Sequence, residues 1–425
     1  MAESFVIVAG AFVLLAVGMW IPFVIAGLAM AIILSAKGVA GLKAVGLVTW
    51  SSSNSFTLTA IPLFVLMAEI LLQSGLASRL YGGLSQLTRR LPGGLLQTNI
   101  IGCAIFSAIS GSSVATAAAI GTVAVPELEK QGYDMRQAYG SLAAGGTLGI
   151  LIPPSIALIV YGAFTESSIV KLFAAGLLPG LVLTFLFASY VAMSGAMTKK
   201  PRAVAEPRAR LLDLVIDVLP VTLLIALVLT SLYAGFATPT EAAAIGCSMA
   251  ALIAFTFGKM DRERLSTAFR RATRTSSTIL IIVVAAFLFS FAMAITGISN
   301  AVTQWVLGLG MSPPMFLVSV ALLYVFLGLF VESIAMMVIT VPLLAPAFGL
   351  YGIDPIWFGV FLVILIEIGQ ITPPFGLNLF VVQSVNRAEY RDVVLGALPY
   401  YAIMLAMLLL LALFPGLALW LPGFV

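Results

Sequence analysis

The chain lacks histidine altogether and has little charge: 9% of its 425 residues are Asp, Glu, Lys or Arg. A soluble globular protein carries about 25% charged residues. The absence of histidine argues against a His-ligated metal centre, a haem and a His-based catalytic triad. No Gly-x-x-x-x-Gly-Lys-Ser/Thr loop is present either, so ATP hydrolysis by that route is excluded. We therefore expect neither an enzyme nor a protein with a resident cofactor.

Cysteine is also scarce, and most of the chain consists of apolar residues. The two cysteines, Cys103 and Cys247, lie in apolar stretches, where we expect unreactive buried thiols. Hydrophobic residues make up 61% of the chain, and residues 101–126, 172–198 and 393–425 contain no charge. A membrane-spanning helix needs about 20 apolar residues. The composition therefore predicts an all-α polytopic membrane protein embedded in a lipid bilayer.

The first apolar run is interpreted as a span rather than a signal peptide, because no basic segment precedes it and no small-residue cleavage site follows it. Breaks at proline, glycine and charged residues divide the rest of the chain. Spans are predicted at 4–20, 21–36, 56–75, 134–165, 173–196, 211–233, 239–258, 276–297, 355–385 and 393–421, with polar-tipped segments at 92–130 and 313–349 and polar or basic segments at 79–90, 198–210 and 259–274.

The second half of the chain repeats the first. A shift of 220 residues needs no gap over almost seventy residues and superimposes Ser113 on Ser333, Pro126 on Pro346, Gly132 on Gly352, Asp134 on Asp354, Gly149 on Gly369, Pro153-Pro154 on Pro373-Pro374, Gly176 on Gly396 and Pro179 on Pro399. Internal repeats are typical of secondary transporters. We interpret the pattern as a duplication.

The basic residues indicate how the two copies are oriented. If 92–130 and 313–349 are re-entrant hairpins, 18 of the 21 basic residues fall on one side, and only Lys37, Lys43 and Lys171 lie opposite. The positive-inside rule makes the basic side cytoplasmic. The copies are then inverted, and both termini are periplasmic. Hairpins that crossed the membrane completely would leave these sides unchanged, so charge alone does not exclude that alternative. The net charge of +4 is read as this topology signal and not as a nucleic-acid footprint.

Two polar hairpin tips and two interrupted spans form the candidate site. Non-helical backbone inside a membrane survives only when it is buried in protein or lines a wet cavity. Free carbonyl groups there suit a hard cation such as sodium, and helix N-termini attract an anion. We expect sodium and substrate to be bound by Ser110, Gly111, Ser112, Ser113, Thr116, Thr147, Gly149, Pro153, Pro154, Glu332, Ser333, Gly369, Gln370, Thr372, Pro373, Pro374 and Asn378, with Ser112, Ser113, Gly149, Ser333, Gly369 and Thr372 as sodium ligands.

Close helix packing is the alternative reading of the small residues in this set. Four carboxylates within or beside apolar segments are weighed separately, because a charge there is costly and usually functional. Glu332, at a tip, is the first candidate for the ion site, and Glu367 is a supporting residue near a break. Glu241 follows Thr238-Pro239-Thr240 and is expected to cap a helix. Glu69 is expected to pair with a basic residue at a domain boundary.

Four motifs resemble those of the large membrane subunit of tripartite ATP-independent periplasmic transporters. They are Ser-Gly-Ser-Ser-Val-Ala-Thr-Ala-Ala-Ala-Ile-Gly at 110–121, Gly-Thr-Leu-Gly-Ile-Leu-Ile-Pro-Pro-Ser at 146–155, Thr-Pro-Thr-Glu-Ala-Ala-Ala-Ile-Gly at 238–246 and Ile-Thr-Pro-Pro-Phe-Gly-Leu-Asn-Leu-Phe at 371–380. The resemblance covers essentially the whole chain. It implies sodium-driven import of carboxylates such as sialic acid or C4-dicarboxylates across the bacterial inner membrane.

The resemblance also implies partners and a mechanism. A periplasmic substrate-binding protein delivers the organic acid, and a small four-span membrane subunit, here expected as a separate polypeptide, joins the large one. The family fold is an elevator, which places a transport domain at 56–165 and 276–385 and a scaffold at 1–55, 166–275 and 386–425. A stand-alone sodium–dicarboxylate symporter of the same architecture is the alternative function. The identity of the acid and the sodium stoichiometry are not apparent from the sequence.

Overall fold

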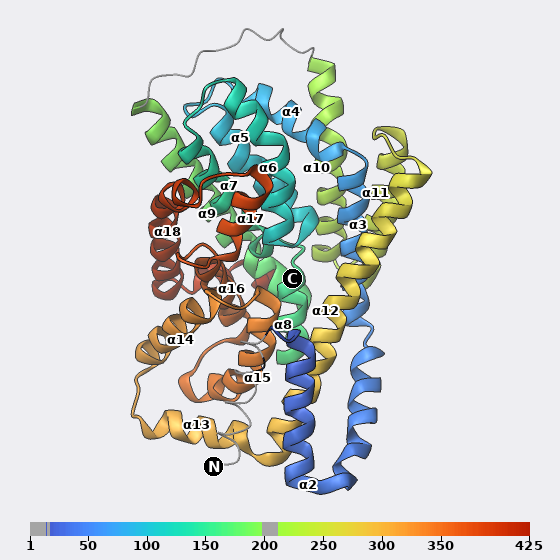
Figure 1. Cartoon of the computed structure of the whole chain (residues 1–425), viewed down its shortest axis with the longest axis vertical. Coiled ribbons are helices and arrows are strands. Elements are labelled where there is room, and N and C mark those ends of the chain that lie inside the picture. Colours follow the sequence, from blue (N-terminus) through green and yellow to red (C-terminus); the bar gives the residue numbers. More distant parts are fainter. Residues whose placement is uncertain (1–13, 15–17, 198–210) are drawn as a thin grey trace.

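The computed structural model describes residues 14, 18–197 and 211–425, which form helices joined by turns without a single strand (Figure 1). Eight helices in this part of the chain are long and apolar enough to cross a membrane. The predicted all-α membrane fold is confirmed. The predicted span 4–20 and the linker 198–210 lie almost entirely outside the described residues.

The first half of the chain contains a helical hairpin followed by a broken helix. Its elements are α2 (Ile21–Ser53), η1 (Thr57–Thr59), α3 (Ala60–Gln73), α4 (Leu76–Thr88), α5 (Leu95–Ser110), α6 (Ser113–Lys130), α7 (Met135–Leu151), α8 (Ile156–Thr165) and α9 (Ile169–Met197). Helices α5 and α6 form the first hairpin, and α7 and α8 are the two parts of the first broken helix.

The second half repeats this order. Its elements are α10 (Leu211–Tyr233), α11 (Pro239–Thr256), α12 (Arg262–Thr296), α13 (Ile298–Gly308), α14 (Pro313–Gly328), α15 (Ser333–Tyr351), α16 (Pro355–Gln370), α17 (Leu377–Asn386), α18 (Tyr390–Leu413), α19 (Gly416–Leu419) and η2 (Leu421–Phe424). Helices α14 and α15 form the second hairpin, and α16 and α17 the second broken helix.

Three segments differ from their predictions. Helix α2 continues past the predicted end and turns back at Gly38, whose φ of 59° suits glycine. The basic segment 79–90 is largely α4, an amphipathic helix bent by 69° from the preceding one. The basic segment 259–274 is mostly the start of α12, which Asp261 caps. At 35 residues, α12 is about 52 Å long, so its basic end extends beyond a hydrocarbon core of about 30 Å.

The two hairpins lie in opposite halves of the molecule. Figure 1 shows α5 and α6 in the upper half and α14 and α15 in the lower half, with the broken helices between them. Helix α8 packs against α15, and α17 packs against α6, so each broken helix ends on the hairpin of the other copy. The predicted inverted repeat is confirmed.

The hairpin tips meet the breaks inside the spans, so the hairpins do not cross the membrane. Helix α5 has 16 residues and is about 24 Å long, which is shorter than the hydrocarbon core. Its end at Ser110 lies beside the interruption of the first broken helix, as described below. The alternative of fully crossing hairpins is therefore wrong.

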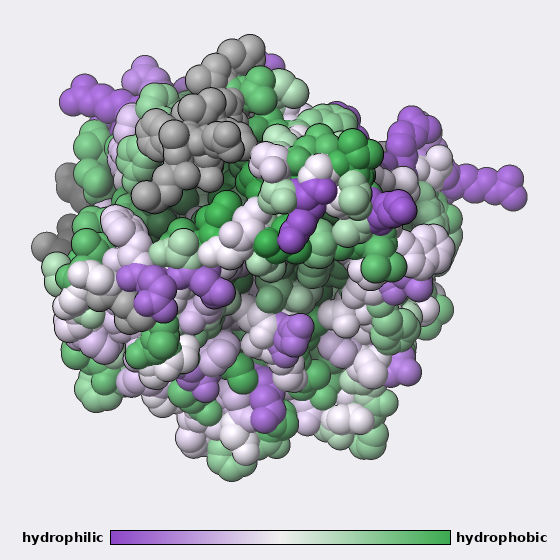
Figure 2. Space-filling model, turned by 90° about the horizontal axis from the view of Figure 1, so that it is seen from below, coloured by the Kyte–Doolittle hydropathy of each residue, from purple (hydrophilic) through white to green (hydrophobic). Residues whose placement is uncertain are grey.

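A second group of helices packs beside this central part. Helix α12 packs along α2 and α3, α11 packs on α3, and α10 packs on α4 and α11. Arg79 of α4 pairs with Asp217 of α10 at 2.8 Å and joins these elements. Seen from below, strongly hydrophilic residues are scattered among apolar ones and do not gather into one patch (Figure 2).

Candidate functional site

Both broken helices are interrupted at a proline pair. Helix α7 ends at Leu151 and α8 begins at Ile156, whereas α16 ends at Gln370 and α17 begins at Leu377. Proline has no N–H group, so Pro153 leaves the carbonyl four residues earlier without its helical donor. The peptide bond within each proline pair is cis. The predicted interruptions are confirmed.

The first tip packs against the first break. Gly111 has a φ of 58°, and a Cβ there would lie 2.9 Å from the carbonyl oxygen of Pro154. A Cβ on Gly149 would lie 2.6 Å from the backbone of Ser112 and Ser113. Only glycine permits these backbones to approach so closely. Ser112 caps α6 by accepting from the N–H of Ala115.

The second tip packs against the second break. Gly328 at the end of α14 and Gly369 in the last turn of α16 are in backbone contact, because a Cβ on either would lie less than 3.0 Å from the other's Cα. The carboxylate of Glu332 accepts from the N–H groups of Ile334 and Ala335 at 3.0 and 3.3 Å. Glu332 therefore caps α15, which is a structural role that the sequence did not predict.

The last turn of α16 binds both hairpins. The hydroxyl of Ser113 donates to the carboxylate of Glu367, and the side-chain amide of Gln370 donates to the hydroxyl of Ser333. Ser113 and Ser333 are equivalent in the two repeats. Glu367 and Gln370 are three residues apart and lie on one face of the helix. The positions equivalent to them in α7 are Thr147 and Ile150, so only the second copy carries this pair.

Two amide oxygens at this place have no hydrogen-bond partner within the described part of the chain. They are the Oε1 atom of Gln370 and the Oδ1 atom of Asn378, both on fully buried side chains. The nitrogen of Asn378 lies 3.5 Å from the second carboxylate oxygen of Glu367, which is itself 1% exposed. The described residues place no Lys or Arg in an ion pair with Glu367. Glu367 is thus bonded by side chains only, and the two amide oxygens beside it have no donor among the described residues.

The remaining predicted residues are near the site but bond within their own segments. Ser110 and Thr116 share a hydrogen bond of 2.7 Å within the first hairpin. Thr147 donates to Ala144 and Thr372 to Ile368, each in its own helix. The tips and breaks named from the sequence are thus brought together. Their roles as sodium or substrate ligands stay a prediction.

The other two intramembrane carboxylates lie away from this cluster. Glu241 forms a capping box with Thr238 at the start of α11, as predicted. Glu69 accepts from Gln73 at 3.5 Å and has no ion pair in the portion that is described. From the sequence, Glu332 is the first candidate for the ion site and Glu367 a supporting residue. The contacts instead place Glu367 at the centre of the cluster, where it meets Ser113 and Asn378.

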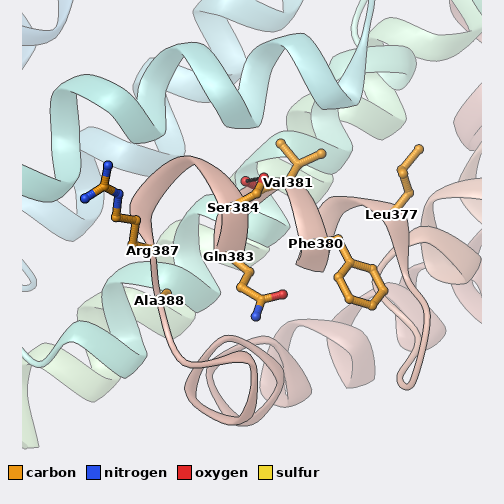
Figure 3. A pocket seen from close by; sticks show the side chains of 7 residues that line it. All are labelled: Leu377, Phe380, Val381, Gln383, Ser384, Arg387 and Ala388. Carbon is orange, nitrogen blue, oxygen red and sulfur yellow. Dashed lines mark hydrogen bonds between the residues drawn. The ribbon is translucent and has the colours of Figure 1, made fainter.

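The two breaks differ in exposure. Pro153 and Pro154 are buried, whereas Pro374 and Phe375 are exposed. An open groove of about 660 Å³ runs along α17 from the second break. Its lining residues are Leu377, Phe380, Val381, Gln383, Ser384, Arg387 and Ala388. Figure 3 shows Leu377 and Phe380 at one end and the guanidinium of Arg387 at the other. Sequence reasoning did not find this groove.

Comparison with known proteins gives one family. Residues 8–417 match the family described as the DctM component of tripartite ATP-independent periplasmic transporters. The C4-dicarboxylate TRAP transporter large permease protein DctM of Pseudomonas aeruginosa is 34% identical over 386 residues, which cover 90% of each chain. The sialic acid TRAP transporter large permease protein SiaM of Vibrio cholerae is 30% identical over 375 residues, 87% of each chain.

A solved structure shares the fold. The YdaH transporter of Alcanivorax borkumensis matches with a TM-score of 0.67 and 15% identity, covering 93% of this chain and 97% of that one. At this identity the likeness concerns the arrangement of the helices. The topology of hairpins and broken helices is therefore one that a solved transporter also adopts.

Proposed function

Because the chain belongs to the DctM component family of tripartite ATP-independent periplasmic transporters, we propose that it imports a small organic acid together with sodium. This family consists of transporter permeases and not of enzymes, and its members are multi-pass proteins of the inner membrane. Two relatives are named for C4-dicarboxylate and for sialic acid. The substrate proposed here is a carboxylate of that kind.

The observation that carries the proposal is the meeting of both tips and both breaks. The tip at Gly111 touches Pro154, and the tip at Ser333 is bound by Gln370. Interrupted helices within a membrane expose peptide dipoles that hydrocarbon cannot satisfy. Carbonyl groups there attract a cation, while the N-termini of α6, α8 and α17 favour the negative carboxylate. One site can therefore bind sodium and the acid side by side.

Two partners belong to the proposal. A periplasmic binding protein delivers the acid, and a small four-span membrane subunit completes the permease. The groove along α17 then serves as the route to the cytoplasm, with the cationic Arg387 near its end. The positive-inside rule supports this direction, although the side on which each terminus lies stays a prediction.

An elevator movement is the proposed way of exposing the site to each side in turn. The contacts favour a moving part different from the predicted 56–165 and 276–385, whose limits remain a prediction. Helix α18 is tied to α7, because Arg136 pairs with Asp392 at 2.9 Å and Gly140 meets the backbone of Gly396. Helix α9 also packs on α7, and a Cβ on Gly176 would lie 2.6 Å from the Leu151 carbonyl. We propose that α9 and α18 move with the hairpins while α3 and α4 stay with α10–α12.

Coupling follows from the order of binding. The exposed carbonyl groups coordinate sodium, which holds the tips in place. The assembled site then binds the acid. Net import requires that the empty domain and the fully loaded domain move more readily than the domain with sodium alone. Sodium does not then leak across without substrate.

The test is reconstitution. The full chain, its small subunit and its binding protein are placed in liposomes with an inward sodium gradient and a radiolabelled C4-dicarboxylate or sialic acid. We expect uptake that stops when sodium is replaced by potassium or choline. Uptake unaffected by that replacement would refute sodium coupling. Uptake by this chain alone, without either partner, would favour the stand-alone symporter.

A further inference from the structure

The excess positive charge of the chain is concentrated in one segment at the start of α12. Residues 259–274 contain six basic and two acidic residues, a net charge of +4 that equals the net charge of the whole chain. Basic and acidic residues therefore balance in the rest of the sequence. The positive-inside rule favours basic loops on one side of the membrane, but it does not require the excess to lie on one helix.

The length of α12 places part of this segment at the membrane surface. Its uncharged stretch, residues 275–296, is about 33 Å long. The hydrocarbon core of a membrane is about 30 Å thick. When this stretch crosses the core, Arg274 lies at the edge of the core. Arg270 then lies one turn further out, at the level of the lipid headgroups.

Four exposed side chains follow one another along a single face of this part of α12. Spaced by four, three and four residues, as neighbours on one helix face are, they are Arg270, Arg274, Ser277 and Ile281. The face opposite to them, which includes Ala268, is buried. This stripe therefore points away from the protein. Along the helix it passes from charge through a hydroxyl group to an apolar side chain.

The two arginines of the stripe have no acidic partner. Neither forms an ion pair within the described ranges. Arg271 on a neighbouring face differs from them, because its charge acts on Glu69 of α3. Glu263, an acidic residue on the same face as the stripe, lies seven residues from Arg270, which is about 10 Å along the helix. Two guanidinium groups one turn apart are therefore free to bind one anion, and their forked donors fit a phosphate.

We propose that this stripe binds an anionic phospholipid. Arg270 and Arg274 hold the phosphate, Ser277 donates to an oxygen near the glycerol, and the start of an acyl chain lies on Ile281. The order of these side chains along α12 is the order in which a lipid presents its phosphate, glycerol and hydrocarbon. A zwitterionic lipid fits less well, because the arginines repel the cation of its headgroup.

The lipid site lies on the part of the protein that is proposed to stay fixed. Helix α12 runs obliquely along α2 and α3 (Figure 1). The turn before it is tied to the end of α3, because the N–H of Lys259 donates to the carbonyl of Ser74 at 2.9 Å. Arg79 of α4 also donates to the carbonyl of Phe257 in this turn. A bound headgroup therefore holds these helices at a constant depth, although the binding itself requires no transport.

The test measures lipid binding by the purified full chain. The protein in detergent is titrated with dihexanoyl phosphatidylglycerol or dihexanoyl phosphatidylcholine, and the bound lipid is counted by native mass spectrometry. We expect the wild type to prefer phosphatidylglycerol. Arg270→Gln combined with Arg274→Gln should raise the half-saturating phosphatidylglycerol concentration about tenfold or more, because two charges at the headgroup level are lost. Unchanged binding in this double variant would overturn the proposal.

A second double variant controls for general attraction to a basic surface. Arg89→Gln combined with Arg90→Gln removes two arginines that are also exposed and form no ion pair in the described part of the chain, but that lie after α4 and outside the stripe. We expect this control to bind phosphatidylglycerol as the wild type does. An equal loss in the two double variants would mean that any surface arginine serves, and it would refute a specific site.

Two measurements distinguish the lipid from other occupants. Inorganic phosphate at the concentration of the lipid should displace little of it, and Ile281→Ser should weaken lipid binding; complete displacement by phosphate would show a simple anion site instead. A variant of Arg270 and Arg274 that loses the proposed small subunit during purification but binds lipid normally would make the stripe a protein contact. All the substituted side chains are exposed, so each variant should unfold at the temperature of the wild type in detergent without added lipid. None of these readouts depends on sodium or uptake, so a failure of the proposed transport leaves them unchanged.

Discussion

Ser113 in the first hairpin donates a hydrogen bond to Glu367 in the second broken helix, although 254 residues separate them. Ser333, the repeat equivalent of Ser113, is bound by Gln370 one turn further along the same helix. Both hairpins therefore bond to side chains in the last turn of α16. The second hairpin also meets this turn through the backbone contact of Gly328 with Gly369.

Removal of the Ser113 hydroxyl is expected to weaken sodium binding more than folding. Ser113→Ala leaves one oxygen of the buried Glu367 carboxylate without its donor, and an unpaired buried acceptor raises the free energy of the protein by about 1–3 kcal/mol. Sodium-dependent uptake should need a several-fold higher sodium concentration. Ser248→Ala removes a hydroxyl that bonds only to the preceding turn of α11 and serves as the control. Equal sodium dependence in the two variants would remove Ser113 from the ion site.

Gly149→Ala is expected to abolish transport. The added methyl group would overlap the backbone of Ser112 and Ser113, which cannot move aside as a flexible side chain can. The first tip must then withdraw from the break. Gly27→Ala adds the same group to α2 where no atom lies within 4 Å. The measurement is uptake normalised to the amount of protein in the liposomes, and wild-type uptake by Gly149→Ala would contradict the described contact.

A cross-link tests which helices move together. Cysteines at Arg136 and Asp392, joined by a short thiol reagent in a Cys247→Ser background, tie α7 to α18. If α18 moves with the hairpins, uptake continues at about the rate of the uncross-linked protein. If α18 belongs to the fixed scaffold, as the predicted boundaries have it, the cross-link stops transport. A linker attached through disulfide bonds allows a reductant to remove the cross-link, and transport should then return.

Thr238→Ala is expected to destabilise the chain without changing the ion site. Thr238 and Glu241 cap α11 reciprocally, with contacts of 2.8 Å from the backbone N–H and the hydroxyl of Thr238 to the carboxylate. Loss of such a cap costs about 1 kcal/mol. Thermal unfolding should occur at a lower temperature while the half-saturating sodium concentration is unchanged. A change in sodium affinity would mean that α11 is coupled to the site.

The hairpins and breaks could be predicted because each has a local signal. The proline pairs at 153–154 and 373–374 mark the two interruptions, whereas single prolines such as Pro179 and Pro399 lie inside continuous helices. The shift of 220 residues identifies the copies. The turn at Gly38 has no such signal, since one glycine in an apolar run is compatible with a straight helix. Helix α4 was missed because its arginines resemble a loop. Asp261 before α12 is a cap that could have marked that helix.

The contacts of the site could not be predicted in the same way. Ser113 and Glu367 meet only because the inverted copies face each other, and neither residue carries a sequence signal for the other. Glu332 stood out as a charge at a tip, but its position directly before α15 lets it bind the first N–H groups of that helix. Glu367 looked secondary because it lies inside a helix.

Thr147 and Glu367 occupy equivalent positions in the two repeats but carry different side chains. This difference has a consequence for the two halves. Among the described residues, this turn of α7 packs closely on its own hairpin, whereas the side chains in the last turn of α16 form hydrogen bonds with both hairpins. A substitution in this turn of α7 is therefore expected to disturb one hairpin, whereas a substitution in the last turn of α16 is expected to disturb both, so the two copies of one duplicated segment differ in how much of the protein depends on them.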